Sequence, residues 1–205
     1  MGGHNGGVLI RGFEAGDTAS LYDICLRTGD SGADASGLYR DPSLIGHVYV
    51  GPYLRLAPSL AFVGVDSLGV AGYVLGAADT VAFDAAAERE WWPGLRERYP
   101  QDSVPADSPD GRLVRLMHSP PETSPDVVER YPAHLHIDLL PRIQGRGNGR
   151  RLLETVLSAL ADAGAPGVHL GVGTANQRAI GFYRRLGFDE VHTYTHSLIM
   201  ARPLT

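Results

Sequence analysis

The pattern of apolar and polar positions is most regular in the last third of the chain. From residue 133 to residue 140 apolar and polar side chains alternate, which predicts a strand with one buried face. Leucines and valines recur at helical spacing between residues 149 and 163 and predict a helix with one buried face. The pattern then predicts a strand at 168–172, a helix at 176–188 and a final strand at 191–202.

The first two thirds of the chain carry shorter and less regular signals. We expect strands at 7–13, 59–65 and 70–79, a helix at 15–29, a broken helix at 41–56, and a helix near 81–98 that Pro93 interrupts. Residues 100–133 are rich in proline and polar side chains. They predict a long irregular loop with one short structured piece at 111–119.

Length and composition favour one globular domain. The chain has 205 residues, 43% of them hydrophobic, which is enough for an ordinary core. It lacks an apolar run of about 18 residues, so we expect no membrane span, and its first residues lack the pattern of a signal peptide. The single cysteine, Cys25, excludes an internal disulfide framework, and together these features predict a cytoplasmic protein.

The charge of the chain is distributed unevenly. All 18 basic residues are arginine, which excludes the lysine of a P-loop and a lysine Schiff base. Residues 134–205 carry eight arginines and five acidic residues, a net charge of +3, whereas residues 1–133 carry ten arginines and 18 acidic residues, a net charge of −8. The basic part predicts an anionic ligand, and no stripe of basic residues indicates nucleic acid.

A glycine-rich segment, "IQGRGNGRR" at residues 143–151, joins the strand at 133–140 to the helix that follows. Glycine permits positive φ and lets a ligand approach the backbone. The first N–H groups of a helix have no partner inside it and attract anions. The segment therefore predicts a phosphate or pyrophosphate site, surrounded by Arg142, Arg146, Arg150 and Arg151. The alternative is a tight turn with solvated arginines.

Two motifs in this order resemble the GNAT N-acetyltransferases. The first is Gln144-x-x-Gly147-x-Gly149 after a strand, and the second is Asn176-x-x-Ala179-x-x-x-Tyr183-x-x-x-Gly187-Phe188. The resemblance implies an α/β GNAT fold with a mixed central sheet of about six to seven strands and helices on both faces. It also implies a single domain over residues 1–205, with 133–202 as the acyl-CoA-binding half and 28–57 and 80–133 on the acceptor side.

A narrower resemblance covers residues 23–54 and 136–139. These are similar to the acetyltransferase-like C-terminal domain of O-GlcNAcases and to its free-standing bacterial relatives. In the eukaryotic version the glycine loop is degraded, whereas here it is intact. The intact loop favours binding of acetyl-CoA.

The resemblance to the GNAT family implies direct transfer of an acetyl group from acetyl-CoA to an amine acceptor, with no covalent enzyme intermediate and no metal. Loop N–H groups would bind the pyrophosphate, strand 137–140 would pair with the pantetheine arm, and the amide of Leu139 or Leu140 would stabilise the oxyanion. The residues implied for CoA binding are Leu139, Leu140, Gln144, Gly145, Arg146, Gly147, Asn148, Gly149, Arg150 and Asn176.

Two residues are candidates for proton transfer. By family position Tyr183 would protonate the leaving thiolate; the alternative is that it packs on the pantetheine. Asp138 is the first candidate for the general base, and its alternative role is as a partner for an arginine or for loop amides. His134 and His136 share its strand face and are weaker candidates, and no third residue near them completes a metal site.

Two hypotheses about activity remain, with the acceptor amine and the oligomeric state left open. The first is an active N-acetyltransferase. The alternative is a catalytically silent acyl-CoA-binding or protein-interaction module. A nucleotide-binding Rossmann-type protein is disfavoured, because the glycine loop comes late in the chain and follows an antiparallel-looking first half.

Overall fold

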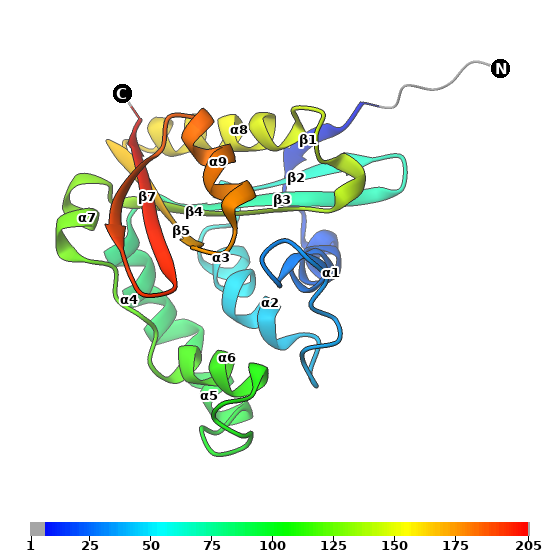
Figure 1. Ribbon diagram of the computed structural model, residues 1–205, viewed down its shortest axis with the longest axis vertical. Coiled ribbons are helices and arrows are strands. Elements are labelled where there is room, and N and C mark those ends of the chain that lie inside the picture. The colour runs from blue at the N-terminus through cyan, green and yellow to red at the C-terminus, as the bar shows by residue number, and fades with distance from the viewer. Residues whose placement is uncertain (1–6, 205) are drawn as a thin grey trace.

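The computed structural model describes residues 7–204, which are built around one seven-stranded sheet with helices on both faces (Figure 1). The strand order is β1-β2-β3-β4-β5-β7-β6. The strands are β1 (Leu9–Gly12), β2 (Ala61–Asp66), β3 (Gly69–Ala77), β4 (Ala133–Leu139), β5 (Gly167–Gly173), β6 (Asp189–Thr193) and β7 (Ser197–Pro203). All neighbours run antiparallel except β4 and β5. This mixed sheet confirms the predicted fold class.

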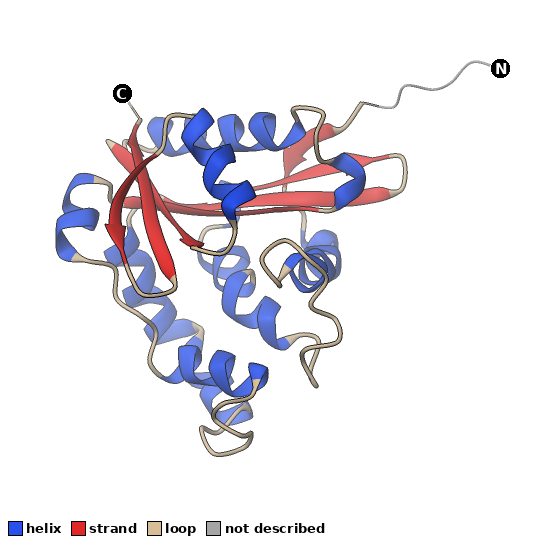
Figure 2. Ribbon diagram, viewed as in Figure 1, coloured by secondary structure: helices blue, strands red, loops and turns tan. Residues whose placement is uncertain are grey.

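The helices cover the two faces of the sheet separately (Figure 2). One face carries α1 (Thr18–Thr28), α2 (Leu44–Tyr49), α3 (Gly51–Leu56), α4 (Thr80–Glu90), α5 (Trp92–Arg98) and α6 (Pro109–His118). The other carries α8 (Asn148–Asp162) and α9 (Gln177–Arg185), and α7 (Pro125–Arg130) lies before β4. None of the helices between residues 7 and 204 combines the length and apolar character that crossing a membrane requires.

Alternation along β3 and β4 separates two hydrophobic cores. Tyr73 and Leu75 pack in the core that contains α1 and α6, whereas Val74 between them packs in the core that contains α8. On β4, Leu135 is buried on the α8 side, and the predicted helix at 149–163 buries its leucines against it. The polar residues of β4 therefore face the α1 side of the sheet.

Two helices occupy residues 100–133, where the sequence predicted an irregular loop with one short structured piece. The hydroxyl of Ser108 caps α6 by accepting a hydrogen bond from the N–H of Gly111 at 3.0 Å, and α6 buries Leu113, Val114 and Met117. Both α6 and α7 have proline in their first turn. Proline breaks a helix interior but is tolerated in the first turn, where its missing N–H is not needed. The high proline content therefore did not mean that residues 100–133 lack helices.

The final predicted strand is instead a hairpin of β6 and β7. The N–H of Tyr194 donates to the carbonyl of Ser197 at 2.7 Å and closes the turn. The turn residues, 194–196, include no glycine, proline, asparagine or aspartate. Those residue types are the ones that mark turns in a sequence. Without them, the alternating pattern predicted one continuous strand.

Strands β4 and β5 are paired at one end only. Their register contains two pairs, Ala133 with Val168 and His134 with His169, although each strand has seven residues. Beyond His134 the strands separate, so within residues 7–204 the facing edges of their second halves have no strand partner. Backbone N–H and C=O groups at such an edge can pair with an extended ligand.

The glycines of α5 and α6 provide a test of the packing. A Cβ on Gly111 would lie 2.1 Å from the carbonyl oxygen of Pro105, whereas a Cβ on Gly94 would meet no atom within 4 Å. We expect Gly111→Ala to lower the free energy of unfolding by about 1–3 kcal/mol. Gly94→Ala, the matched control, should raise it by up to about 1 kcal/mol. Thermal unfolding measures both, and equal midpoints would contradict the packing described for α6.

Candidate active site

A cavity of about 640 Å³ occupies the opening between β4 and β5. Its walls come from the second halves of both strands, from the glycine loop before α8, and from the first turns and inner face of α9. Thr28, Ser31 and Gly32, at and after the end of α1, close one side. Segments from both ends of the chain therefore meet around the two separated strands.

The glycine loop presents a row of unpaired N–H groups to this cavity. Gly145 and Gly147 have φ of +77° and +76°, a conformation that favours glycine. Within residues 7–204, the six backbone N–H groups from residue 145 to residue 150 donate no hydrogen bond, and Gly147 caps α8 without a side chain. Unpaired donors at the positive end of a helix dipole attract anions, so the loop remains the predicted anion site.

Only some of the loop arginines can serve this anion site. Arg150 lines the cavity and also pairs with Glu154 at 2.7 Å, and Arg146 is exposed. Arg142 instead donates to Asp66 at 2.8 Å, and Arg151 donates to the carbonyl of Val8 at 3.0 Å. The expectation that all four arginines surround the loop is therefore wrong for the last two, whose side chains tie the loop to the edge of the sheet.

Two arginines that the sequence analysis did not select line the same cavity. Arg178 and Arg185 both lie on α9, seven residues apart, so they share one face of the helix. This spacing was visible in the sequence, but only the separation of β4 and β5 brings α9 to the cavity. The positive charges around the ligand site thus come from α8 and α9 together.

The predicted amide side chains of the loop and of α9 have different roles. Gln144 donates from Nε2 to the carbonyl of Leu139 at 2.6 Å and lines the cavity. Asn148 is buried and donates from Nδ2 to the carbonyl of Ile143 at 2.9 Å, so its side chain holds the loop and only its N–H remains for a ligand. Asn176 caps α9 through Oδ1, which leaves its Nδ2 for the cavity.

The backbone of β4 directs the amide of Leu139 into the opening. The N–H of Leu140 donates to the carbonyl of Ala71 on β3 at 2.8 Å. Hydrogen-bonded pairs alternate along an antiparallel ladder, and Leu139 pairs with Gly72 in the next position, so the Leu139 amide faces away from β3. Of the two amides considered for the oxyanion, Leu140 is already bonded and Leu139 faces the cavity.

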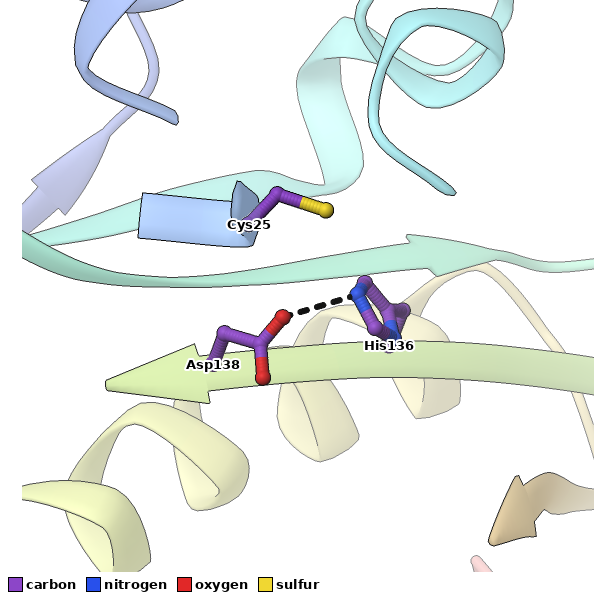
Figure 3. Close-up of side chains that lie close together, drawn as sticks. All are labelled: Cys25, His136 and Asp138. Atoms are coloured by element: carbon purple, nitrogen blue, oxygen red, sulfur yellow. Dashed lines mark ion pairs between the residues drawn. The ribbon is translucent and has the colours of Figure 1, made fainter. Parts of the chain in front are cut away.

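The polar face of β4 carries a compact hydrogen-bonded cluster (Figure 3). The hydroxyl of buried Tyr73 donates to Oδ2 of Asp138 at 2.7 Å and lies 3.1 Å from Nε2 of His136. His136 Nε2 is also 3.1 Å from Asp138 Oδ2. Burial alone would lower the pKa of His136, but the charge and hydrogen bond of Asp138 outweigh it and raise that pKa to about 10. Cys25 of α1 lies beside both residues.

Tyr183 lies on α9 with its ring packed against Phe182 and Phe188. It lines the cavity, and its hydroxyl has no hydrogen-bond partner in residues 7–204. Burial, with a smaller contribution from the negative charge of Asp138, raises the pKa of Tyr183 above its usual value. The phenol is therefore protonated near neutral pH and is directed to the same cavity as Asp138.

His134, a weaker candidate from the sequence, and His118 of α6 have structural contacts. His134 bonds through Nδ1 to the hydroxyl of Thr80 at 2.8 Å, and burial lowers the pKa of His134 to about 3, so it is neutral. His118 bonds through Nε2 to the carbonyl of Tyr99 at 2.8 Å. Neither residue lines the cavity.

Comparisons with known proteins agree with this arrangement. A family model described as "Acetyltransferase (GNAT) family" matches residues 83–188. The crystal structure of a protein named SsHAT is 42% identical, covers 97% of this chain and 99% of that one, and has a TM-score of 0.91. PaiA N-acetyltransferase from Thermoplasma acidophilum, solved with coenzyme A, is 15% identical with a TM-score of 0.59 over 96% of this chain and 98% of that one, and shows the fold alone.

Curated relatives match over a shorter stretch. An uncharacterised N-acetyltransferase of Mycobacterium tuberculosis is 45% identical over 60 residues, which is 29% of this chain and 38% of that protein. The chain spans between 19% and 38% of the length of the first curated relatives that it matches.

Gly147 offers a direct test of the loop as the ligand site. An aspartate there would satisfy the unpaired N–H groups with its own carboxylate and repel phosphate, so we expect Gly147→Asp to raise the dissociation constant for acetyl-CoA at least about tenfold. Gly164→Asp is the matched control, because Gly164 also has positive φ and open space but lies beyond the other end of α8. Calorimetric titration measures the dissociation constant of both variants. Equal constants would exclude the loop as the binding site for acetyl-CoA.

Proposed function

Because the chain belongs to the acetyltransferase (GNAT) family, we propose that it is an enzyme that moves an acetyl group from acetyl-CoA directly to the nitrogen of an amine. One observation carries the proposal. The glycine loop, with its six unpaired N–H groups, and the open edge of β4 border one cavity, which is also lined by Asp138 and Tyr183.

The cavity would supply partners for the pyrophosphate and for the pantetheine arm of CoA. The N–H groups of residues 145–150 would bind the pyrophosphate, with Arg150, Arg178 and Arg185 neutralising its charge. The amide-rich pantetheine arm would pair with the free edge of β4 as an added strand, and Nδ2 of Asn176 would donate to the same arm. This orientation brings the thioester toward the end of β4.

The transfer is a nucleophilic attack of the amine on the thioester carbonyl. The N–H of Leu139 would donate to the oxyanion of the tetrahedral intermediate, since it is the free amide at this point of the strand. Such a donor acts because its dipole is already oriented before charge develops. The attack forms the C–N bond, and collapse of the intermediate re-forms the C=O bond, breaks the C–S bond and releases the CoA thiolate.

Tyr183 would return a proton to that thiolate. Its raised pKa keeps the phenol protonated, and the hydroxyl is free to donate. In water a phenol of pKa about 10 is a weak donor to a thiolate whose acid has a pKa of about 8.5. The buried surroundings that raise the pKa of Tyr183 would also raise the pKa of the CoA thiol, which offsets the weaker acidity of the buried phenol.

Asp138 would receive the proton that the amine loses. Its Oδ2 is held by the hydroxyl of Tyr73 and by His136, so the carboxylate has one fixed position at the end of β4. A fixed carboxylate within reach of the attacking nitrogen provides general-base catalysis. Tyr73, which is fully buried, acts as a positioning residue for Asp138.

The acceptor would approach from the α1 side of the sheet. The segments at 28–57 and 80–133 hold α2 to α7, and residues 1–133 carry the net charge of −8, which favours a cationic amine. The sequence similarity at 23–54 supports placing the protein with the free-standing bacterial relatives of the O-GlcNAcase acetyltransferase-like domain.

The test is release of free thiol from acetyl-CoA in the presence of a panel of amines, from lysine peptides to amino sugars and polyamines. We expect at least one amine to raise the rate, and Asp138→Asn to lose most of that increase, because spontaneous acetylation would not depend on Asp138. Saturable binding of acetyl-CoA with no amine-dependent thiol release would instead support the silent binding module.

Tyr183→Phe separates general acid catalysis from packing. Removing only the hydroxyl should lower kcat at least about tenfold and leave the dissociation constant for acetyl-CoA nearly unchanged. Tyr194→Phe is the matched control, because Tyr194 is 40% exposed in the β6–β7 turn and lies outside the cavity. Equal turnover of the two variants would assign Tyr183 to packing on the pantetheine.

A further inference from the structure

We propose that Cys25, His136 and Asp138 form a binding site for Zn²⁺, and that the bound ion blocks acetyl transfer. Sulfur, nitrogen and carboxylate oxygen atoms of these three residues all lie within 4.8 Å of one another. Figure 3 shows the sulfur atom of Cys25, which comes from α1, close to the side chains of His136 and Asp138 on β4. The sequence analysis expected no metal site, because Cys25 is more than a hundred positions away from the residues of β4.

The distances suit one shared ion. Zinc binds sulfur at about 2.3 Å and nitrogen or carboxylate oxygen at about 2.0–2.2 Å, so two ligand atoms of one ion lie roughly 3–4 Å apart. His136 Nε2 and Asp138 Oδ2 are 3.1 Å apart, and Cys25 lies within 4.8 Å of both. Small side-chain rotations are enough to bring all three onto one centre.

The ligand types select the class of metal. A set of one thiolate, one imidazole and one carboxylate suits Zn²⁺ and related transition metals, whereas Mg²⁺ and Ca²⁺ require oxygen ligands. Cys25 is the single cysteine of the chain and is 1% exposed. A metal bound through it is therefore shielded from the thiols of other molecules.

The site has an entry path and an open fourth position. The side chains of His136 and Asp138 are 30% and 20% exposed and line the cavity, whereas Cys25 lies behind them. An ion arriving through the cavity would meet these two residues first and then the thiol. Three protein ligands with a fourth position facing a cavity is the open arrangement that accepts water or a ligand thiolate.

Tyr73 would support the site from outside the metal's own ligands. Its hydroxyl donates to Oδ2 of Asp138 at 2.7 Å and so orients the carboxylate. Hydrogen bonds of this kind to metal ligands fix their orientation and strengthen binding. Tyr73 is fully buried, so this support does not depend on solvent.

Inhibition follows from competition for one carboxylate. Asp138 coordinated to Zn²⁺ is not available to accept a proton from the attacking amine. The inhibitory effect rests on the proposed acetyl transfer, whereas the binding of the ion does not.

The experiment titrates the full chain with Co²⁺, which reports its ligands by absorption, and then displaces it with Zn²⁺. We expect one Co²⁺ per chain, with the near-ultraviolet band of a thiolate bound to cobalt and the visible bands of tetrahedral coordination. Cys25→Ser should abolish the thiolate band, and His136→Gln should weaken Zn²⁺ binding at least about tenfold. Thermal unfolding confirms that each variant is folded. If Cys25→Ser does not fold, the test of the proposed site rests on His136→Gln and on the thiolate band of the unaltered chain.

His192→Gln is the matched control, because His192 lies on β6, outside the cavity, with its ring tilted against that of Tyr194. It should bind both metals as the unaltered chain does. Absence of a thiolate band, or loss of binding in His192→Gln to the same extent as in His136→Gln, would overturn the proposed site.

A separate measurement addresses inhibition. Acetylated amine is quantified by mass spectrometry, because Zn²⁺ also binds the thiol that is released. Zn²⁺ should suppress product in the unaltered chain, and a chelator should restore it. If absorption shows that the metal binds but product formation does not change, the proposed inhibition is refuted. If the unaltered chain shows no turnover with any amine, that result counts against the proposed acetyl transfer and leaves the metal-binding result unaffected.

Discussion

The separation of β4 and β5 is the feature on which the rest of the site depends. Two parallel strands that pair only at residues 133–134 and 168–169 expose backbone donors and acceptors inside a sheet that is otherwise continuous. Such groups need a partner, and an extended ligand with its own amides can provide one. The cavity, the direction of the Leu139 amide and the approach of α9 all follow from this opening.

Strand β4 serves the proposed chemistry through its edge and through one face at the same time. Its edge faces the opening and carries the free Leu139 amide, while its polar face carries Asp138 and His136 beneath α1. Its apolar face packs on α8, whose N-terminus holds the glycine loop. Because the edge, the polar face and the apolar face belong to one strand, the glycine loop and the carboxylate of Asp138 are held in fixed positions relative to each other.

Local patterns in the last third of the chain predicted the structure well, whereas patterns that depend on context did not. The glycine loop and α8 follow from glycine spacing and apolar periodicity, which act within a few residues. Proline in the first turns of α6 and α7 suggested a loop, and the turn between β6 and β7 lacks marker residues. The same limit applied to Arg142 and Arg151, whose partners Asp66 and Val8 are remote in sequence.

The sequence by itself determined the order of elements around the glycine loop, the place of that loop at the start of a helix, where we propose that it binds an anion, and the resemblance to GNAT acetyltransferases. These depend on φ preferences, helix ends and spacing, all of which are local properties of a chain. Only the tertiary structure decided which amide of β4 is free, that Arg178 and Arg185 reach the cavity, and that Cys25 and Tyr73 join Asp138. Those relations arise from strand register and from packing between distant segments, which no local pattern encodes.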